Sequence, residues 1–306
     1  MTQAKSFGEM NFGHAELGDK RRTKRLVKLA DQMCLRPGGS LPQKLRSPAD
    51  LHAFDRLMDK DDVTHEAILD SHRQRALQRM KELEGPVLVL HDATELEYTT
   101  RKSLTKLGQI GNGNRRGYIT HNSLAVDPET KDVIGLCNQV LHRRPQVPKS
   151  ETRAQRNKRQ SRESLLWIQG TQPLPADRQI VDVCDRGADT AEFIEHEMNS
   201  GRRFVIRASH DRCILIGHGL PEESQAAKLK HYASTLPQAG TWTMQVTSKS
   251  EMKSPRRKGK KASRQNSVGF GKSSLFQEYF ESDADKSGET LREAVVAFKL
   301  PRYPDR

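Results

Sequence analysis

Two aspartates, Asp92 and Asp185, each stand at the end of a short apolar run, and this placement suits them to metal-dependent chemistry on phosphates. The runs, residues 87–91 and 180–184, have the length and the β-branched content of buried strands. If the two strands are parallel neighbours, their carboxyl ends lie about 5 Å apart at one edge of a sheet. Two carboxylates at that separation repel each other unless a cation lies between them, and oxygen ligands favour Mg²⁺ or Mn²⁺. The pattern therefore predicts a metal site for phosphoryl transfer.

Each aspartate also has a structural explanation, because a polar residue often ends a strand or caps the next helix. Because two strands end in the same way in one strongly basic chain, we favour a metal site over two independent structural aspartates. Asp182 lies inside the second run and Asp189 opens a predicted helix, so we expect both to be structural. His91 and His121 are expected to pack or to hydrogen-bond, because sites built from oxygen ligands seldom need imidazole.

The composition favours a polyanionic partner. The chain has 306 residues, 34% of them hydrophobic and 30% charged, with a net charge of +13 and a pI near 9.7. Such an excess of cations suits nucleic acid or an acidic membrane face. No stretch approaches the roughly 20 apolar residues of a membrane span and no signal segment is recognisable, so the expectation is a cytoplasmic protein without a membrane partner. The four cysteines show no zinc-binding spacing and are expected to be free thiols.

The first 82 residues are predicted to be helical. Helices are expected to begin after Asp19, after Ser47 and after Thr64, each of which is a good N-cap. The first of these helices has an apolar stripe and an opposite cationic face, made of Lys20, Arg21, Arg22, Lys24, Arg25 and Lys28. No acid lies among these six residues, so they repel one another unless a polyanion binds. A DNA backbone is the predicted partner, although most charged faces of this kind are simply solvated.

From residue 85 onward the pattern changes from helical to extended. Runs at 118–126 and 133–142 predict a β-hairpin, and a basic irregular stretch leads to a short helix near 165–168. The second aspartate strand, a helix over 190–198 and a strand over 203–207 follow. This order predicts a mixed α/β fold, with a mixed sheet flanked by helices in the ribonuclease-H-like arrangement.

Residues beyond about 210 carry weaker signals. Residues 241–246 alternate like one strand, and 253–264 form a run of cations without an acid. Within this run, the cluster 253–261 resembles a localisation or RNA-binding tag equally well. The remainder is polar, and we assign it no element.

A series of motifs occurs in a fixed order along the chain. They lie at 16–26, 53–57, 63–68, 91–94, 107–108, 117–118, 120–124, 163–164, 167, 184–189 and 203–209. Together they resemble the bacterial cut-and-paste DDE transposases of the insertion-sequence-four family, whose helical N-terminal domain grips the transposon end. Residues 91–94 resemble the family's first-acid motif and residues 184–189 its second-acid motif. The resemblance extends from residue 14 to about residue 210.

The resemblance implies specific roles. Asp92 and Asp185 would be catalytic and would bind the divalent ions, Mg²⁺ or Mn²⁺, that activate water or a DNA 3′-hydroxyl. Arg207 would lie near the DNA, and a homodimer would hold two element ends. The family's third acid is a glutamate in a Tyr-x-x-Arg-x-x-x-Glu helix, and no glutamate of this chain matches that pattern. We therefore expect a C-terminally truncated transposase, cut short by a frameshift or an early stop, that binds DNA and cleaves it poorly.

The predicted organisation is a helical end-binding domain over 1–82, an incomplete ribonuclease-H-like catalytic domain over 83–240 and a basic remnant over 241–306. The predicted function is DNA transposition through metal-dependent strand cleavage and transfer. Two alternatives remain open. One is a catalytically inactive DNA-binding regulator, and the other is a stand-alone magnesium-dependent nuclease whose third acid is Glu289 or Glu293.

Overall fold

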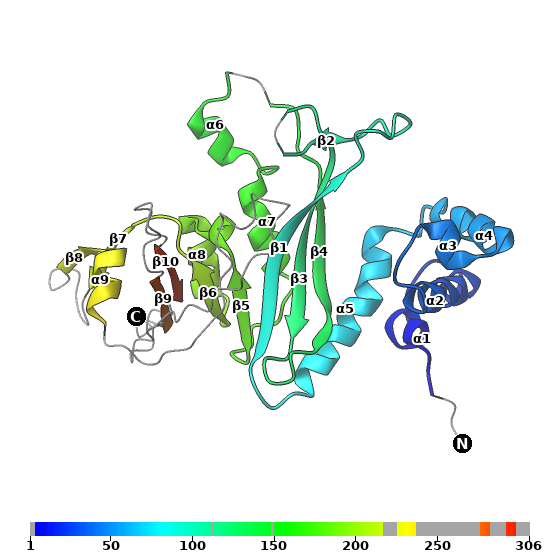
Figure 1. Cartoon of the computed structure of the whole chain (residues 1–306), viewed down its shortest axis with the longest axis horizontal. Helices are drawn as coiled ribbons and strands as arrows, with labels where there is room; N and C mark the ends of the chain where they lie inside the picture. Colours follow the sequence, from blue (N-terminus) through cyan, green and yellow to red (C-terminus); the bar gives the residue numbers. More distant parts are fainter. Residues whose placement is uncertain are drawn as a thin grey trace, which may run out of the picture. The chain divides into compact units, whose positions relative to one another are not determined.

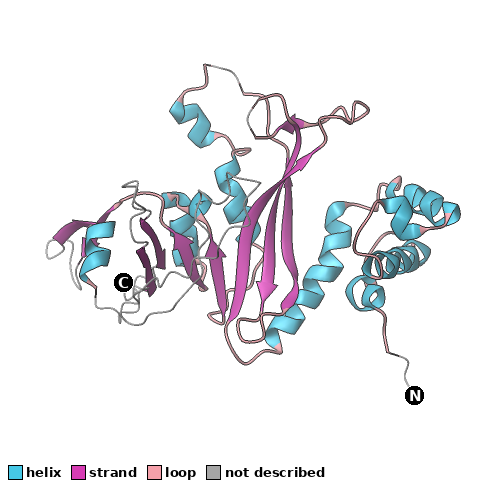
Figure 2. Ribbon diagram, viewed as in Figure 1, coloured by secondary structure: helices cyan, strands magenta, loops and turns pink. Residues whose placement is uncertain are grey.

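The computed structural model describes residues 4–111, 113–147, 150–216 and 225–236, together with the strands at 276–281 and 292–297. The chain forms two compact units, Met1–Pro175 and Ala176–Arg306 (Figure 1). Helices accompany both parallel and antiparallel strand pairs, which confirms the predicted mixed α/β fold class (Figure 2). Within the described ranges, no helix has the length and apolar character needed to cross a membrane.

The first unit opens with five helices, and their starts follow from side-chain caps. They are α1 (Phe7–Phe12), α2 (Lys20–Cys34), α3 (Leu41–Leu45), α4 (Pro48–Met58) and α5 (His65–Lys81). Asp19, Ser47 and Thr64 each accept a hydrogen bond from a backbone N–H in the first turn, so the three predicted helix starts are confirmed. The shorter helices α1 and α3 were not predicted. Buried leucines, Leu17, Leu26, Leu29, Leu45 and Leu57, form the common core of these helices.

An antiparallel sheet follows in the same unit. Its strands are β1 (Val87–Glu97), β2 (Gly108–Gln109), β3 (Arg116–Val126) and β4 (Val133–His142). β3 pairs with β1 over its whole length, with β4 along most of it and with β2 at its start. The predicted hairpin between β3 and β4 is confirmed, and Asp127 N donates to Asp132 O at 3.0 Å across the turn.

The helices beyond the sheet differ in part from the prediction. α6 (Arg153–Lys158) lies in the stretch that was expected to be irregular, and a capping box at Thr152 stabilises its start. A 3₁₀ turn, η1 (Glu163–Leu165), leads into α7 (Leu166–Thr171), which is the expected short helix.

The prediction that Asp92 ends a strand is wrong. β1 continues through Asp92 to Glu97, because residues 93–97 pair with 117–121 of β3 although their side chains are mostly exposed. Backbone pairing with a long neighbouring strand thus extends β1 well past its apolar half.

The second unit combines a parallel pair with antiparallel strands. β5 (Ile180–Cys184) pairs in parallel with β6 (Arg203–Arg207), and α8 (Ala191–Asn199) connects them, as predicted. β7 (Cys213–Ile216), β8 (Gln225–Lys228), α9 (Leu229–Thr235), β9 (Phe276–Glu281) and β10 (Arg292–Ala297) were not predicted. β6 also pairs with β10, and β10 with β9, both antiparallel. The predicted strand at 241–246 and the cationic run at 253–264 lie outside the described residues.

Candidate functional site

Asp92 lies on an exposed position in the middle of β1. Its Oδ1 accepts a hydrogen bond from the backbone N–H of Ala93 at 2.8 Å. Within the described ranges its other carboxylate oxygen has no hydrogen-bond partner. Asp92 is directly opposite Asn122 of β3, so the two side chains project from the same face of the sheet. This face offers a carboxylate oxygen that is free to bind a cation.

A chain of hydrogen bonds leads from this face to the start of α5. Asn122 Oδ1 accepts from Gln139 Nε2 at 2.7 Å, and Gln139 Oε1 lies 2.9 Å from His65 Nε2. Because Gln139 Oε1 can only accept, His65 donates from Nε2. These bonds use the amide oxygen of Asn122 and leave its NH₂ group as a donor on the face where Asp92 lies. The neighbouring side chain therefore presents a hydrogen-bond donor on the face that carries Asp92.

The opposite face of β1 and β3 carries a neutral polar layer. The rings of His91 and His121 stack with centroids 5.8 Å apart, and Trp167 meets His121 edge-on at 4.7 Å. The Ser123 hydroxyl lies 3.0 Å from His91 Nδ1 and 3.1 Å from the carbonyl oxygen of Gly170. Both histidines are buried in this layer, as expected from the sequence.

Burial sets the protonation state of His121. Its side chain has no exposed surface, and neither ring nitrogen has a hydrogen-bond partner in the described part of the chain. Desolvation, followed by the charge of His91, lowers the pKa of His121 to about 3. His121 is therefore neutral at pH 7 and acts as a packing residue behind Asp92.

Asp185 directly follows β5, where the sequence predicted it. Its Oδ1 accepts from the backbone N–H of Gly187 at 2.7 Å and caps the 3₁₀ turn η2 (Arg186–Ala188). The second oxygen of this exposed carboxylate has no hydrogen-bond partner among the residues described. Burial and the charge of Arg186 lower the pKa of Arg207, while Asp185 opposes this shift. Asp185, Arg186 and Arg207 therefore lie close enough for their charges to interact.

Buried ion pairs support this second site. Arg202 Nε donates to Asp182 Oδ2 at 2.6 Å and Arg202 Nη2 to Glu197 Oε1 at 3.2 Å, and all three side chains are almost fully buried. Asp182 lies on β5 itself, so this triad fixes the strand that carries Asp185. Asp182 has the structural role expected from the sequence.

Asp189 is also structural. Its Oδ2 accepts from the backbone N–H groups of Ser209 and His210 at 2.7 and 2.9 Å, and Arg212 holds its Oδ1. Burial alone would raise the pKa of Asp189, but these hydrogen bonds together lower it. The carboxylate therefore remains ionised and ties the chain beyond β6 to the turn after Asp185.

Asp92 and Asp185 both fit a role as Mg²⁺ or Mn²⁺ ligands. Each is exposed, has one oxygen oriented by a backbone amide and presents the other to solvent. Asp92 belongs to the first unit and Asp185 to the second, so the prediction that they share an ion stays a prediction. In the described ranges, no three side chains of His, Cys, Asp or Glu gather in a metal-binding group.

The cationic face of α2 is partly neutralised by acids that come from outside the helix. Arg22 pairs with Asp62 at 2.6 Å, while Arg25 and Lys28 pair with Asp50 at 3.2 and 2.7 Å. The expectation that these cations need a polyanion to relieve their repulsion is therefore wrong for three of the six. The acids that neutralise them lie far away in the sequence, so a search within 20–28 could not find them.

Lys20, Arg21 and Lys24 have no ion-pair partner in the described part of the chain. All three are exposed at the start of α2. They form the free cationic surface of this helix, and they are the part of the predicted DNA-binding face that remains available to phosphates.

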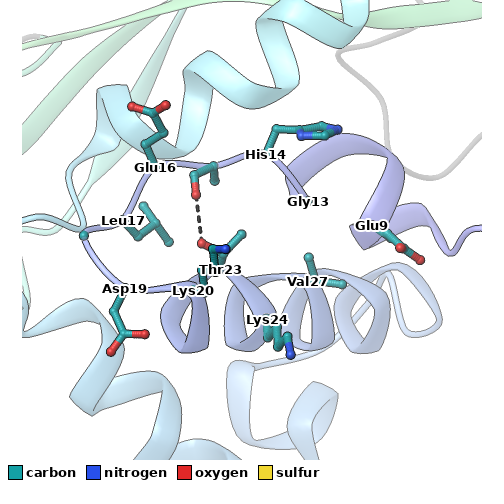
Figure 3. Close-up of a pocket in the computed structure, with 12 residues that line it drawn as sticks. Glu9, Gly13, His14, Glu16, Leu17, Asp19, Lys20, Thr23, Lys24 and Val27 are labelled. Carbon is teal, nitrogen blue, oxygen red and sulfur yellow. Dashed lines mark hydrogen bonds between the residues drawn. The ribbon is translucent and has the colours of Figure 1, made fainter.

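A cavity of about 690 Å³ lies beside this surface, between the end of α1 and the first turns of α2 (Figure 3). Thr23 Oγ1 donates to the carbonyl oxygen of Ala15 at 2.8 Å and holds the intervening segment against α2. The lining is mixed in charge, because three acids share it with the lysines; these residues are Glu9, Glu16, Asp19, Lys20 and Lys24. This mixture makes the cavity a weaker phosphate site than the exposed helix surface.

Residues 4–63 match the model of a family described as Transposase DNA-binding. The match spans α1 to α4 and includes the free cations of α2. It supports a transposase, and it supports DNA as the partner of this part of the chain.

Among solved structures, the chain is similar to a cryo-EM structure of the piggyBac transposase synaptic complex with hairpin DNA. The sequence identity is 10% and the TM-score 0.40, over 91% of this chain. The matched region spans 52% of the piggyBac chain, about half its length. A similarity at this level supports no assignment of individual residues.

Proposed function

We propose that this chain is a DDE-type transposase related to the bacterial insertion-sequence-four family. In this proposal the N-terminal helices bind the ends of an insertion element, and Asp92 and Asp185 take part in DNA cleavage and strand transfer. The observation that carries the proposal is the match of residues 4–63 to a transposase DNA-binding family, in a region where exposed cations stand without acidic partners.

The DNA contact is assigned to the start of α2. Lys20, Arg21 and Lys24 can bind phosphates without first breaking an ion pair, whereas Lys28 must leave Asp50. Each phosphate neutralised by such a residue releases counterions, so binding should weaken steeply with salt. Arg207 is proposed as a further DNA contact near Asp185.

The catalytic role is assigned to the two exposed aspartates. Asp92 and Asp185 would hold Mg²⁺ or Mn²⁺, which when bound would activate the attacking hydroxyl and stabilise the charge on the phosphate. The neutral layer behind Asp92 and the ion triad behind Asp185 hold the two strands in place. A homodimer would bring two element ends together.

A second candidate function is DNA binding without cleavage, as a regulator. It is favoured by the positions of the late acids, because the family's third acid lies on a helix whereas Glu281 and Glu293 lie on strands β9 and β10. The stand-alone nuclease remains a further alternative. Its other candidate acid, Glu289, lies outside the described residues.

One assay separates these functions. The purified chain is incubated with a labelled duplex that carries an element end, with Mg²⁺ or Mn²⁺, and both binding and nicking are measured. A transposase should nick the duplex, and Asp92→Asn or Asp185→Asn should reduce nicking at least 100-fold with unchanged binding. Asp132→Asn, which changes another exposed aspartate of the first unit, should have no effect.

The other outcomes are equally clear. Binding without nicking in the wild type would favour the regulator. Nicking that survives both aspartate substitutions would refute the catalytic assignment. Nicking that is lost in Glu289→Ala or Glu293→Ala would favour the nuclease.

A further inference from the structure

A strongly basic cavity lies at the start of β3, outside the region that matches the transposase DNA-binding family. Its volume is about 1070 Å³, and residues from the loop after β1, from β2, from the start of β3 and from the segment after β4 line it. Figure 1 shows β2 and α6 at this end of the strands. Among the residues that the structure describes, the lining holds six cations and one carboxylate: Arg101, Lys102, Arg116, Arg143, Arg144, Arg159 and Glu163.

The cavity is built by close backbone packing. A side chain on Gly108 would meet the backbone of Arg144 at 2.8 Å, so glycine lets β2 lie directly against the segment after β4. Tyr98 N donates to Arg116 O at 2.8 Å, and Tyr118 Oη donates to Lys106 O at 3.0 Å. These bonds fix the loop after β1 over the cavity.

Two of the six cations are already neutralised. Arg144 forms a bidentate pair with Glu163, and Arg159 Nε lies 3.0 Å from Glu151 Oε1. The hydrogen bond from Arg144 lowers the pKa of Glu163, so this carboxylate stays ionised in its pair. Glu163, the one acid among the described residues of the lining, is thus paired with Arg144 and does not neutralise the other cations.

The remaining four cations have no acidic partner in the described ranges. Arg101, Lys102, Arg116 and Arg143 are all exposed, and their side chains are in no ion pair. Four unpaired positive charges around one hollow repel one another and attract an anion that carries several charges. The volume of the cavity is at the upper limit of the usual range for small-molecule sites, about 300–1,000 Å³.

The chemistry of the lining indicates how an anion would be held. No aromatic side chain is among the described residues that line the cavity, so bases have no ring on which to stack. The charged groups of the lining suit phosphates and are indifferent to base sequence, and Thr99, Thr105, Gln109 and Gln146 can also donate to phosphate oxygens.

We infer that this cavity is a second DNA-binding site, which holds the phosphodiester backbone without reading the bases. The inference rests on the proposed function in that it takes DNA as the polyanion. It adds a contact that is separate from α2, on the same unit as Asp92. Such a site would hold DNA that lies beyond the segment recognised by the N-terminal helices.

The test uses the full chain and two matched triple variants. The cavity variant is Arg101→Gln, Arg116→Gln and Arg143→Gln. The control variant is Lys81→Gln, Lys131→Gln and Arg178→Gln, which removes the same charge from exposed cations elsewhere whose side chains form no ion pair within the described ranges. Binding of a 30-base-pair duplex of arbitrary sequence is measured by fluorescence anisotropy over a series of KCl concentrations, and thermal unfolding checks that all three proteins are folded.

The cavity variant should bind at least tenfold more weakly than the wild type at about 100 mM salt. Its slope of log affinity against log salt should be smaller by about 2–3, because each lost phosphate contact lowers the slope by about 0.9. The control variant should change both quantities much less. Equal effects of the two variants would overturn the inference.

The other outcomes of the binding experiment distinguish a failure of this inference from a failure of the proposed function. A wild type that binds no duplex would overturn both. A duplex affinity that falls with the cavity variant but not with Arg21→Ala or Lys24→Ala would overturn only the assignment to α2. Competition by inorganic phosphate at constant ionic strength would show a small-anion site and would overturn the assignment to a DNA backbone.

Discussion

The two aspartates stand on supports of opposite electrostatic character. Behind Asp92, the face of β1 and β3 is a layer built around the neutral ring of His121, which packs against His91 and Trp167. Behind Asp185, β5 is tied to the chain by the buried charges of Asp182 and its partners. Both supports leave the candidate carboxylate exposed and hold the strand next to it in place.

The two supports should therefore respond differently to mutation and to a change of pH. A buried ion triad is stable only while every charge is compensated, because one unpaired buried charge is costly. A neutral histidine layer avoids that cost, but only while the imidazole stays unprotonated. The region of Asp185 should therefore be sensitive to loss of a partner, and the region of Asp92 to acid.

The largest effect is expected from Arg202→Met, which leaves Asp182 and Glu197 buried without their cation. The free energy of unfolding should fall by about 3–5 kcal/mol. The measurement is urea denaturation at pH 7. Arg178→Met, the same change at an exposed arginine, should cost less than about 0.5 kcal/mol. A cost for Arg202→Met as small as that of the control would remove the contrast between the two supports.

The second effect is a pH dependence that belongs to His121. Its pKa in the folded protein, about 3, lies below the ordinary 6.5, so the folded state binds fewer protons than the unfolded state. The stability that His121 contributes is present above pH 6.5 and is lost as the pH falls from 6.5 toward 3. Between pH 7 and pH 5 the wild type should lose about 2 kcal/mol of unfolding free energy through this residue.

The measurement compares wild type with His121→Leu in urea at pH 7 and pH 5. The variant should lose less stability on acidification, by roughly that amount, because leucine does not titrate. His52→Leu, at an exposed histidine, serves as the control and should keep the wild-type pH dependence. Identical pH dependence in His121→Leu and wild type would contradict the neutral-layer account.

The smallest effects are expected from single hydroxyls in the two supports. Ser123→Ala removes the buried hydroxyl between His91 and Gly170 and should cost about 1–2 kcal/mol. Ser209→Ala removes one of several hydrogen bonds to Asp189 and should cost less, about 0.5–1 kcal/mol. Thermal unfolding of both variants side by side tests the order, and a reversed order would contradict the larger contribution assigned to the buried Ser123 hydroxyl.

The sequence predicted elements that carry a local signal. The capped helices α2, α4 and α5, the hairpin of β3 and β4, and the unit from β5 to β6 follow from caps, turns and periodicity. The sequence did not predict β9 and β10, because their strand character depends on pairing with β6 and with each other rather than on their own residues. The same cause explains why β1 continues past Asp92, where β3 supplies the partner.

Individual residues of the candidate site could be predicted from the sequence, but the contacts between them could not. Asp92, Asp185 and the cations of α2 could be named from the sequence, but the acids Asp50 and Asp62 could not, because they reach α2 through tertiary packing. The alignment of Asn122 and Gln139 with Asp92 needs the strand register, which sequence spacing does not give. The alternation of side chains along a strand assigns each residue to one face of the sheet. It does not say which residue of the neighbouring strand lies opposite.

The helix α5 joins the region that matches a DNA-binding family to the sheet that carries Asp92. It begins at His65, just past that match, and its Arg73 donates to the carbonyl oxygen of Cys137 in β4. On its other side, the hydroxyl of Ser71 donates to the backbone of Asn11, directly after the first turn of α1. No free linker separates the helices from the strands, so the two should move as one block. In the proposed function, a duplex bound by the helices would then reach Asp92 at a constant distance, and the spacing between the recognised sequence and the cleaved bond would not vary.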